Sequence, residues 1–400
     1  MGKPKIRFKG YADDWEQRKL GDVCSRVQGN DGRMDLPTLT ISAGNGWMRQ
    51  EDRFSGNIAG KEQKNYTLLH RGELSYNHGN SKLAKYGTVF SLQTYEEALV
   101  PRVYHSFKVE NGSADFVEYY FATKLPDKEL GKLISSGARM DGLLNIGYEE
   151  FMRIPFLFPK EEEQNKISLY FRSLDSLITL HQRKCDETKK LKKYMLQKMF
   201  PQNGEKVPKI RFAGFSDDWE QRKFSELYVR SSEKNDGSIG MDKNITVATM
   251  QFKEDVQVST AEYLKTYYTF NLGDIAFEGH QSKEFRYGRF VENDIGNGIV
   301  SHIFAVFRPI QEYDLYFWKY AINNETLMQR ILGRSTKAST MMHDLVANDF
   351  LNETFLVPSI DEQKQIGSLF NKLDHLITLH QQKCDELQNI KKFMLKNMFV

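Results

Sequence analysis

Four polar loops carry the side chains of this sequence that are best suited to chemistry. They combine amide, guanidinium and ammonium groups, which pair with base edges, with hydroxyls and glycine N–H groups, which bind phosphates. The candidate DNA-binding residues are Asn77, His78, Asn80, Ser81, Lys82, Lys85 and Tyr86 in the first loop, Arg139 in the second, His280, Gln281, Lys283 and Arg286 in the third, and Arg334 and Lys337 in the fourth. Ordinary solvated turns have the same composition, so both interpretations stay open at this point.

Signatures of catalysis are missing from the sequence. It has no GxxxxGK[ST] phosphate loop, no glycine-rich SAM-type loop followed by an Asn/Asp-Pro-Pro-aromatic motif and no HExxH, and its nine histidines fall in no ligand pattern. Asp127 with the later pair Glu187 and Lys189 offers a nuclease-like set, but this glutamate lies far along the chain on an expected helix. We therefore predict no catalytic residue and no metal site.

Two histidines and two cysteines invite a metal or redox interpretation. His181 and His380 occupy equivalent positions on the apolar seam of two predicted helices, as do Cys185 and Cys384. A polar residue on such a seam usually fixes helix register, and a buried cysteine packs as a small apolar side chain. The structural interpretation is favoured in both cases.

Composition describes a folded protein and says little about its partners. The 400 residues are 40% hydrophobic, which supplies material for two or three domain cores. The 56 basic and 53 acidic residues leave a net charge of only +3, so binding of nucleic acid would depend on local patches. Three cysteines without CxxC spacing suit a reducing compartment. No signal peptide or spanning segment is recognisable, so we predict a cytoplasmic protein.

The chain is an internal tandem repeat. Ile178–Glu187 returns almost unchanged as Ile377–Glu386, 199 positions later, and the segments Lys5–Phe8 and Asp13–Lys19 return at Lys209–Phe212 and Asp217–Lys223. Each repeat thus has a shared N-terminal segment, a variable block and a long helix. Shared ends with different middles suggest one frame that carries two different binding domains.

The variable blocks mix strand-like and helix-like runs. Leu36–Ile41 and Gly87–Leu92 in the first block, and Ile245–Thr249 and Ile299–Phe307 in the second, are predicted strands. Phe116–Leu125 and Leu315–Leu332 are predicted helices. The fold class is therefore α+β, with domains of mixed α/β structure.

A long helix follows each block and begins just after Pro159 and Pro358, where acidic residues suit a helix start. Its apolar positions repeat about every 3.5 residues, which predicts coiled-coil packing of one copy on the other. The predicted packing residues are Ile167, Phe171, Leu174, Ile178, His181 and Cys185 in the first copy and Ile366, Phe370, Leu373, Ile377, His380 and Cys384 in the second.

The short linker between the repeats favours an antiparallel helix pair. A helix of about 40 residues spans roughly 60 Å, whereas the linker 201–208 reaches at most about 28 Å. Antiparallel helices need no return of the chain, and they bring Val400 near Lys5. We predict two domains separated by two long antiparallel helices that form an intramolecular coiled coil, with pseudo-two-fold symmetry. The predicted segments are a variable domain at 1–158, a helix at 159–200, the linker at 201–208, a second variable domain at 209–357 and a helix at 358–400.

These features resemble the specificity subunit of a type I restriction-modification enzyme. The similarity rests on the Trp-Glu-Gln-Arg-Lys runs at Trp15 and Trp219, on the Gly-acidic turns at Gly72 and Gly273, and on Pro159 with Glu163-Gln164 and Pro358 with Glu362-Gln363. Asn352–Phe355 departs from the Ile-Pro-Phe that precedes the first helix.

The resemblance implies that the variable domains are target-recognition domains, each of which reads half of a split double-stranded DNA site. It implies that the helices set the gap and that the chain, itself non-catalytic, docks two methyltransferase subunits and translocating nuclease (restriction) subunits. SAM, ATP and Mg²⁺ would then belong to those partners, with no cofactor on this chain. The alternative from another class is a cytoplasmic coiled-coil scaffold whose two variable domains bind protein.

Overall fold

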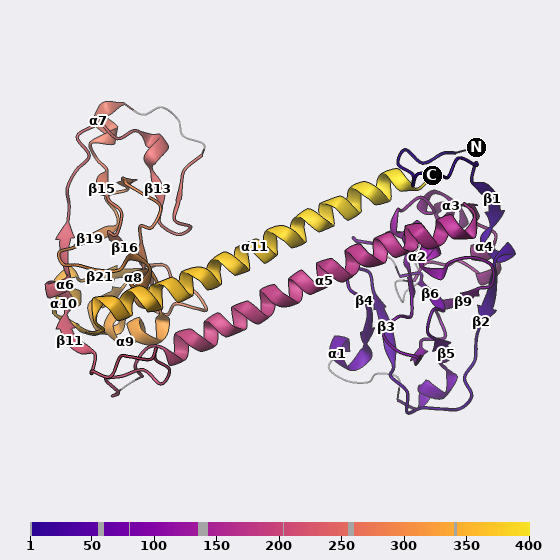
Figure 1. The fold of residues 1–400 in the computed structure, drawn as a ribbon, viewed down its shortest axis with the longest axis horizontal. Helices are drawn as coiled ribbons and strands as arrows, with labels where there is room; N and C mark the ends of the chain where they lie inside the picture. Colours follow the sequence, from indigo (N-terminus) through magenta and orange to yellow (C-terminus); the bar gives the residue numbers. More distant parts are fainter. Residues whose placement is uncertain are drawn as a thin grey trace. The chain divides into compact units, whose positions relative to one another are not determined.

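The computed structural model describes residues 2–54, 60–79, 81–134, 143–202, 204–254, 260–339 and 342–400 (Figure 1). The chain divides into two compact units. Unit 1 holds the residues up to His181 together with Gln382–Val400, and unit 2 holds Gln182–Gln381. Each of the two long helices, α5 (Glu161–Lys198) and α11 (Ile360–Met398), is divided between the two units.

Both units are built from short strands and helices, and their central strands follow one another in a similar order, although among the described residues unit 2 has an additional hairpin, β20-β21. The other elements of unit 1 are β1 (Glu16–Lys19), η1 (Leu20–Asp22), β2 (Cys24–Val27), β3 (Leu39–Ser42), β4 (Gly46–Arg49), α1 (Gln50–Phe54), η2 (Gly60–Asn65), β5 (Thr67–His70), β6 (Leu74–Asn77), β7 (Thr88–Ser91), β8 (Glu97–Val100), β9 (His105–Val109), α2 (Ala114–Ala122), α3 (Asp127–Leu133), α4 (Tyr148–Met152) and β10 (Pro155–Phe158). Those of unit 2 are β11 (Glu220–Lys223), α6 (Phe224–Leu227), β12 (Tyr228–Ser231), η3 (Met241–Lys243), β13 (Ile245–Thr246), β14 (Gln251–Phe252), α7 (Ala261–Leu264), β15 (Tyr268–Phe270), β16 (Ile275–Glu278), β17 (Arg289–Glu292), β18 (Gly298–Val300), β19 (Ala305–Pro309), α8 (Leu315–Ile322), α9 (Glu325–Ser335), β20 (Thr336–Ala338), β21 (His343–Leu345), α10 (Ala347–Asn352) and β22 (Thr354–Val357).

A four-stranded antiparallel sheet forms the centre of each unit. Its strand order is β2-β9-β6-β7 in unit 1 and β12-β19-β16-β17 in unit 2. Smaller two-stranded sheets lie beside it, β3-β4 and β5-β8 in unit 1 and β13-β14 and β15-β18 in unit 2. The predicted mixture of strands and helices in each domain is confirmed.

Two predicted elements of unit 2 are each divided in the structure. The predicted strand Ile299–Phe307 is two strands, β18 and β19, because the chain turns where Phe304 N donates to Ser301 O (3.1 Å) and the two strands join different sheets. The predicted helix Leu315–Leu332 is two helices, α8 and α9. The side chain of Asn324 accepts from Thr326 N (3.1 Å) and so starts a new helix at this point.

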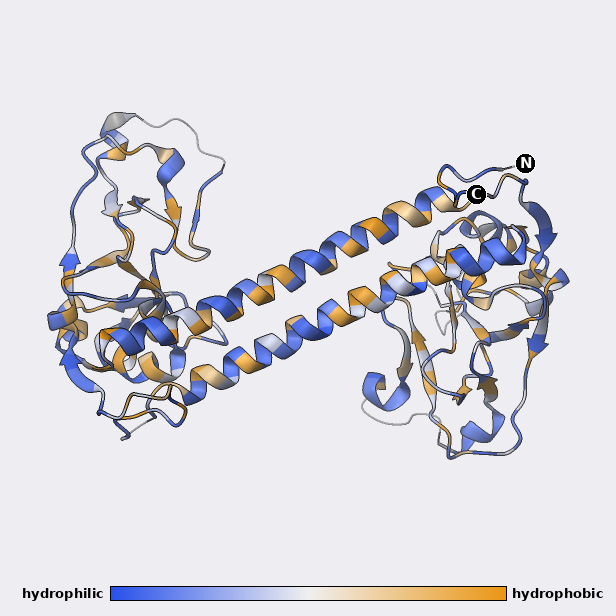
Figure 2. Ribbon diagram, in the orientation of Figure 1, coloured by the Kyte–Doolittle hydropathy of each residue, from blue (hydrophilic) through white to orange (hydrophobic). Residues whose placement is uncertain are grey.

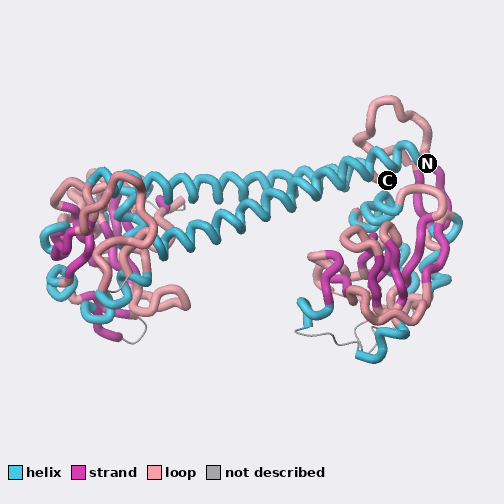
Figure 3. The backbone as a smooth tube through the Cα atoms, turned by 60° about the horizontal axis from the view of Figure 1, so that its bottom comes forward, coloured by secondary structure: helices cyan, strands magenta, loops and turns pink. Residues whose placement is uncertain are grey.

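The repeated ends of each unit pair with one another. β1 pairs antiparallel with β10, and β11 pairs in the same way with β22, so the departure at Asn352–Phe355 leaves this strand pair intact. In unit 1, Ile6 N donates to Asn397 O (2.9 Å), and the equivalent bond of unit 2 runs from Ile210 N to Lys198 O (2.9 Å). The predicted approach of the C-terminus to the N-terminal segment is confirmed, and Figure 3 shows both chain ends together.

Aromatic side chains at the ends of the long helices fill the two cores. Phe399 lies edge-on to Trp15 in unit 1, and Phe200 lies edge-on to Trp219 in unit 2, with ring centroids 6.2 and 6.0 Å apart. Both phenylalanines are buried. Each core is therefore completed by the helix that belongs to the other sequence repeat.

The helices run antiparallel within each unit. In unit 1, Asp175 pairs with Lys391, and three residues further on Ile178 accepts from Cys384 Sγ (3.4 Å). In unit 2, the Ile377 carbonyl lies 3.9 Å from Cys185 Sγ, and Lys192 Nζ lies 2.6 Å from Asp374 Oδ1. Residue numbers fall on one helix as they rise on the other, so the predicted antiparallel packing is confirmed.

Apolar and polar residues alternate along both helices, as Figure 2 shows. In the described parts of the chain, no helix is long and apolar enough to span a membrane.

Candidate nucleic-acid interface

The first predicted loop connects β6 to β7 at the edge of the unit 1 sheet. Ser81, Lys82 and Lys85 are exposed there, and the Lys85 ammonium lies 5.3 Å from the centre of the half-buried Tyr86 ring. The Asn77 amide points back into the domain, donating to Ile41 O (3.2 Å) while its carbonyl accepts from Gly79 N (3.0 Å). The outer surface of the loop is therefore basic, whereas Asn77 at its start is held by hydrogen bonds within the domain.

His78 lies beneath this loop instead of on its surface. The side chain is buried, with Nδ1 2.7 Å from Leu144 O and Nε2 2.9 Å from Val103 O. Both contacts are hydrogen bonds only when the ring carries two protons. His105 stacks on it with centroids 5.0 Å apart, and burial lowers the pKa of His105 to about 4. His78 thus connects the β6-β7 loop to the segments that contain Val103 and Leu144.

The third predicted loop connects β16 to β17 in unit 2 and has the same setting. His280, Gln281, Lys283 and Arg286 are all exposed on it. The Arg286 guanidinium lies 5.3 Å from the centre of the Tyr287 ring, and Gln281 Nε2 lies 3.2 Å from Nδ1 of His343.

The structure brings the third and fourth predicted loops together in unit 2, and in unit 1 it joins the first loop to the residue that follows the second loop, whose own residues lie outside the described ranges. In unit 1, Gly79 forms a β-bridge with Leu143, the residue that follows the second loop. In unit 2, His343 of β21 donates its N–H to Gly279 O (2.8 Å), so the β20-β21 hairpin lies against the third loop. Lys337 is exposed on that hairpin. Asn80 and Arg139 lie outside the described residues.

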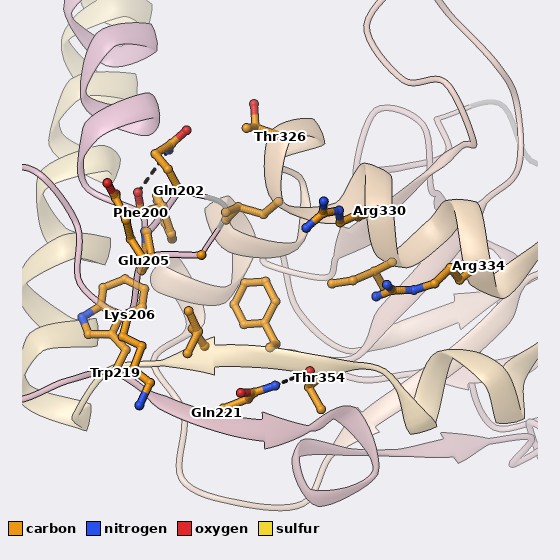
Figure 4. A pocket seen from close by; sticks show the side chains of 16 residues that line it. Phe200, Gln202, Glu205, Lys206, Trp219, Gln221, Thr326, Arg330, Arg334 and Thr354 are labelled. Atoms are coloured by element: carbon orange, nitrogen blue, oxygen red, sulfur yellow. Dashed lines mark hydrogen bonds between the residues drawn. The ribbon is translucent and has the colours of Figure 1, made fainter.

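Arg334 is paired with an acidic side chain of its own unit. It lies in the last turn of α9, where its Nε donates to Glu353 Oε1 (2.8 Å), and Glu353 raises its pKa. The side chain also lines a cavity of ≈380 Å³ in unit 2, shown in Figure 4, together with Arg330 and the linker residue Lys206. This cavity is walled by the strand pair β11-β22, where Gln221 donates to Thr354.

A hairpin in each unit contributes to the loop cluster without having been predicted from the sequence. Asn77 contacts Ile41 of β3, and the β3-β4 turn at Gly44 approaches the side chain of Leu83. In unit 2 the turn after β13 meets the base of the third loop, because Arg289 Nη2 donates to Ala248 O (2.8 Å). These turns lack the lysines and arginines that marked the other loops, so composition gave no signal for them.

The predicted helix-packing residues fall into two groups by burial. Ile178, His181, Ile377 and His380 are half-buried. The others are buried, namely Ile167, Phe171, Leu174, Cys185, Ile366, Phe370, Leu373 and Cys384. Phe171 and Phe370 also pack on their own recognition domains, with ring centroids 5.0 Å from Tyr119 and 5.2 Å from Tyr320. In the described residues, no group of three or more His, Cys, Asp or Glu side chains could hold a metal ion.

The Glu-Gln pair at each helix start joins three parts of its unit. Glu163 accepts two hydrogen bonds from Arg7 (both 2.7 Å), and Glu362 accepts two from Arg211 (2.7 and 2.8 Å). Gln164 donates to Pro159 O and accepts from Ser113 N, which precedes α2. Gln363 makes the same contacts with Pro358 O and Asp314 N. The motif is therefore a structural joint between the N-terminal segment, the long helix and the recognition domain.

Comparison with known proteins supports a restriction-modification fold. The whole chain superposes on the S subunit of a type I restriction-modification system from M. genitalium with a TM-score of 0.62 at 13% sequence identity, covering 100% of this chain and 99% of that one. The HsdS subunit from Thermoanaerobacter tengcongensis gives a TM-score of 0.45 at 13% identity, with 98% of each chain covered. No curated protein matches the sequence.

Residues 216–389 match the family model described as type I restriction modification DNA specificity domain. The match covers 174 of the 400 residues, and together with the likeness to the solved S subunit it confirms the resemblance to a type I specificity subunit.

Proposed function

We propose that this chain is the non-catalytic, sequence-specific DNA-binding subunit of a type I restriction-modification complex in the cytoplasm. The observation that carries the proposal is the repetition of one basic loop cluster at the same sheet edge of both recognition domains. Different side chains on a repeated frame suit a site with two unlike halves, each read by one domain. The functional segments are recognition domains at 1–158 and 209–357, spacer helices at 159–200 and 358–400, and a linker at 201–208.

The two long helices set the gap between the half-sites in this proposal. Helices of 38 and 39 residues are about 57 to 59 Å long, and half-sites on one face of DNA lie about 34 Å apart or a multiple of that distance. Seven residues inserted after His181 and seven after Gln381 lengthen both helices by about 10 Å. We expect the gap to grow by about three base pairs with both half-sequences unchanged. An altered half-sequence would contradict the separation of spacer from reader.

Exposed leucines on the helices are the proposed docking sites for two methyltransferase subunits. Leu177 and Leu180 of α5 and the equivalent Leu376 and Leu379 of α11 are each more than 40% exposed. Leucines one helical turn apart form an apolar stripe, and such stripes mark protein contacts. Restriction subunits would join this assembly, and SAM, ATP and Mg²⁺ would be bound by the partners.

Copurification tests the docking sites. Leu177→Asp with Leu180→Asp should about halve the methyltransferase recovered per chain, and adding Leu376→Asp with Leu379→Asp should abolish its recovery. Leu83→Asp is the matched control, because Leu83 is more exposed but lies on a recognition loop; it should leave recovery intact. Equal recovery with all variants would place the contact elsewhere.

A coiled-coil scaffold that binds only proteins is the competing function, favoured by the small net charge of +3. The deciding experiment is to co-express the chain with its methyltransferase subunit and to map methylated adenines across the host genome. A split motif with an unspecified gap supports DNA recognition. A contiguous motif, or no motif, overturns it.

A further inference from the structure

The two β-hairpin loops of the recognition domains share a turn geometry but carry different residues at six of their ten positions. Leu74–Asn77 of β6 and Thr88–Ser91 of β7 correspond to Ile275–Glu278 and Arg289–Glu292 at one constant offset of 201 positions. The loops between them are therefore equal in length and can be compared residue by residue.

The shared residues of the two loops make the same contacts. Ser81 Oγ accepts from Ala84 N at 3.1 Å, and Ser282 Oγ accepts from Phe285 N at 3.0 Å. Backbone bonds also match, from Ser81 N to Ala84 O and from Ser282 N to Phe285 O. The serine thus fixes one four-residue turn in both domains.

A stacked cation and tyrosine follow this turn. Lys85 lies over Tyr86 and Arg286 over Tyr287, each with 5.3 Å from the cationic group to the ring centre. Each tyrosine packs on a helical glycine, since a Cβ atom at Gly131 would lie 3.3 Å from Tyr86 Cε1 and one at Gly333 would lie 3.1 Å from Tyr287 Cε2.

Each loop ends at a glycine whose backbone is in the left-handed conformation. Gly87 and Gly288 both have φ of +82°, and a Cβ atom on either would lie 2.5 Å from the carbonyl oxygen of Asn77 or Glu278. Serine, cation, tyrosine and glycine thus hold one fixed loop geometry in both domains.

Within that fixed loop, the exposed residue after the shared lysine differs completely. Lys82 is followed by Leu83 and Lys283 by Glu284. Leu83 is 71% exposed although apolar. Glu284 is exposed too, and its carboxylate has no side-chain partner in the described part of the chain. Neither side chain takes part in the serine, tyrosine and glycine contacts that hold the loop.

We infer that the shared Lys82/Lys283 and Lys85/Arg286 pairs hold the DNA backbone, whereas Leu83 and Glu284 read bases, one in each half-site. This inference rests on the proposed DNA-recognition function. Ammonium and guanidinium groups bind phosphates without regard to sequence, which suits residues that both domains keep. A cavity of ≈350 Å³ beside Arg286 is also lined by Arg330, which adds positive charge at the proposed phosphate position.

The two variable side chains have distinct base preferences. A carboxylate between two cations is repelled by phosphates, but it accepts a hydrogen bond from the N4 amino group of cytosine in the major groove. An exposed leucine contacts the 5-methyl group of thymine. The half-site read by the second domain should therefore contain a cytosine that depends on Glu284, and the other half-site a thymine that depends on Leu83.

A structural role for Glu284 competes with this assignment. Glu284 and Phe285 line a cavity of ≈550 Å³ opposite Lys189, Lys192 and Lys193 of α5, so the carboxylate sits in the field of three ammonium groups. If that attraction were its purpose, removing it would change stability and leave base preference unaltered.

The test uses the chain in complex with its methyltransferase and a pool of duplexes randomised across both half-sites. Glu284→Leu should change discrimination at a single base position by about 5- to 150-fold, and Leu83→Glu should do the same in the other half-site. In each variant the untouched half-site is the folding control. Lys283→Ala should weaken binding to all sequences alike and reduce the salt slope by about 1.

Three outcomes separate the possibilities. Uniform weakening by Glu284→Leu, or no effect on base preference, overturns the reader assignment while DNA recognition stands. A changed base preference with Lys283→Ala overturns the backbone assignment. If the unaltered complex selects no split sequence, the proposed function itself fails.

Discussion

The two recognition domains share a frame but differ inside. At the frame, Arg7 and Arg211 pair with buried Glu163 and Glu362 in the same geometry, 2.7 Å from Nε to Oε1 in both units. The flanking strand pairs and the glutamine contacts also repeat. Contacts that join helix, N-terminal segment and domain are therefore kept.

Inside the domains, equivalent positions carry different side chains, and buried charged groups have different partners. In unit 1, Ser91 accepts from Arg172, which also pairs with Asp115 and Glu118. In unit 2 the position of Ser91 is occupied by Glu292, which is 2% exposed and has no hydrogen-bond partner for either oxygen among the described residues. The contacts between the N-terminal segment, the long helix and the domain are therefore the same in both repeats, whereas the interiors of the two recognition domains have diverged.

The largest expected loss of stability follows from removing the buried Arg–Glu pair at the start of a long helix. Glu163→Ala and Glu362→Ala each leave a largely buried arginine without its partner, and loss of such a partner costs about 3–5 kcal/mol. Denaturant unfolding should show similar losses for the two variants. Glu187→Ala is the control, because the exposed Arg183–Glu187 pair contributes only about 0.3–0.5 kcal/mol. A loss confined to one unit would show that the two frames are not equivalent.

A second prediction concerns the helix position that contacts the cap of α2 or α8. In unit 1, Ser168 Oγ lies 2.8 Å from Oγ of Ser113, which caps α2. In unit 2 the larger Asp314 caps α8, and the facing residue is Gly367, where a Cβ atom would lie 2.2 Å from Asp314 Oδ1 and 2.6 Å from Phe317 N. Gly367→Ser should therefore cost about 1–3 kcal/mol through overpacking.

The converse exchange, Ser168→Gly, should cost only about 1 kcal/mol, the usual penalty of glycine in a helix. The two variants are compared by thermal unfolding of the whole chain. A tolerated Gly367→Ser would mean that Asp314 moves aside, and the proposed steric difference between the units would be wrong.

The third prediction concerns the dependence of stability on pH. Burial raises the pKa of Glu292 well above its usual value, and Asp294 nearby acts in the same direction. The folded state then holds this proton more tightly than the unfolded state, so its contribution to stability is complete below about pH 4.5 and is lost as pH rises through the folded pKa.

Comparison with Glu292→Gln isolates this contribution. Relative to that variant, the unaltered chain should lose about 1.4 kcal/mol of unfolding free energy for each unit by which the folded pKa is raised. Glu312→Gln, at an exposed site, is the control and should show no such trend. Parallel pH profiles for the unaltered chain and Glu292→Gln would mean that the carboxylate finds a partner when ionised.

Much of the architecture could be read from the sequence because it is local or repeated. Helix starts at Glu161 and Ile360 follow from proline and acidic residues, which satisfy the first helical turn. The apolar spacing gave the helix pair, and the short linker gave its direction. The Glu-Gln motif was recognised as a signature, yet its role as a joint with Arg7 and Ser113 appeared only in the fold.

The candidate site was less accessible to sequence reasoning. Lysine-rich loops were found, because composition marks them. His78 was grouped with surface residues although it is buried, and Arg334 was grouped with the loops although it pairs with Glu353. Polarity alone cannot distinguish a solvent-facing group from one that bonds a carbonyl contributed by a distant segment.

By itself, the sequence determined the tandem repeat, the long helices and the positions of the variable blocks, since all of these depend on periodicity and identity along the chain. The Gly-acidic turns at Gly72 and Gly273 already have an offset of 201 positions, but only the strand pairing of the tertiary structure showed that Leu83 and Glu284 occupy equivalent positions in the two β-hairpin loops. That alignment depends on strand pairing between residues far apart in sequence, and strand partners are chosen by packing in three dimensions and not by local composition.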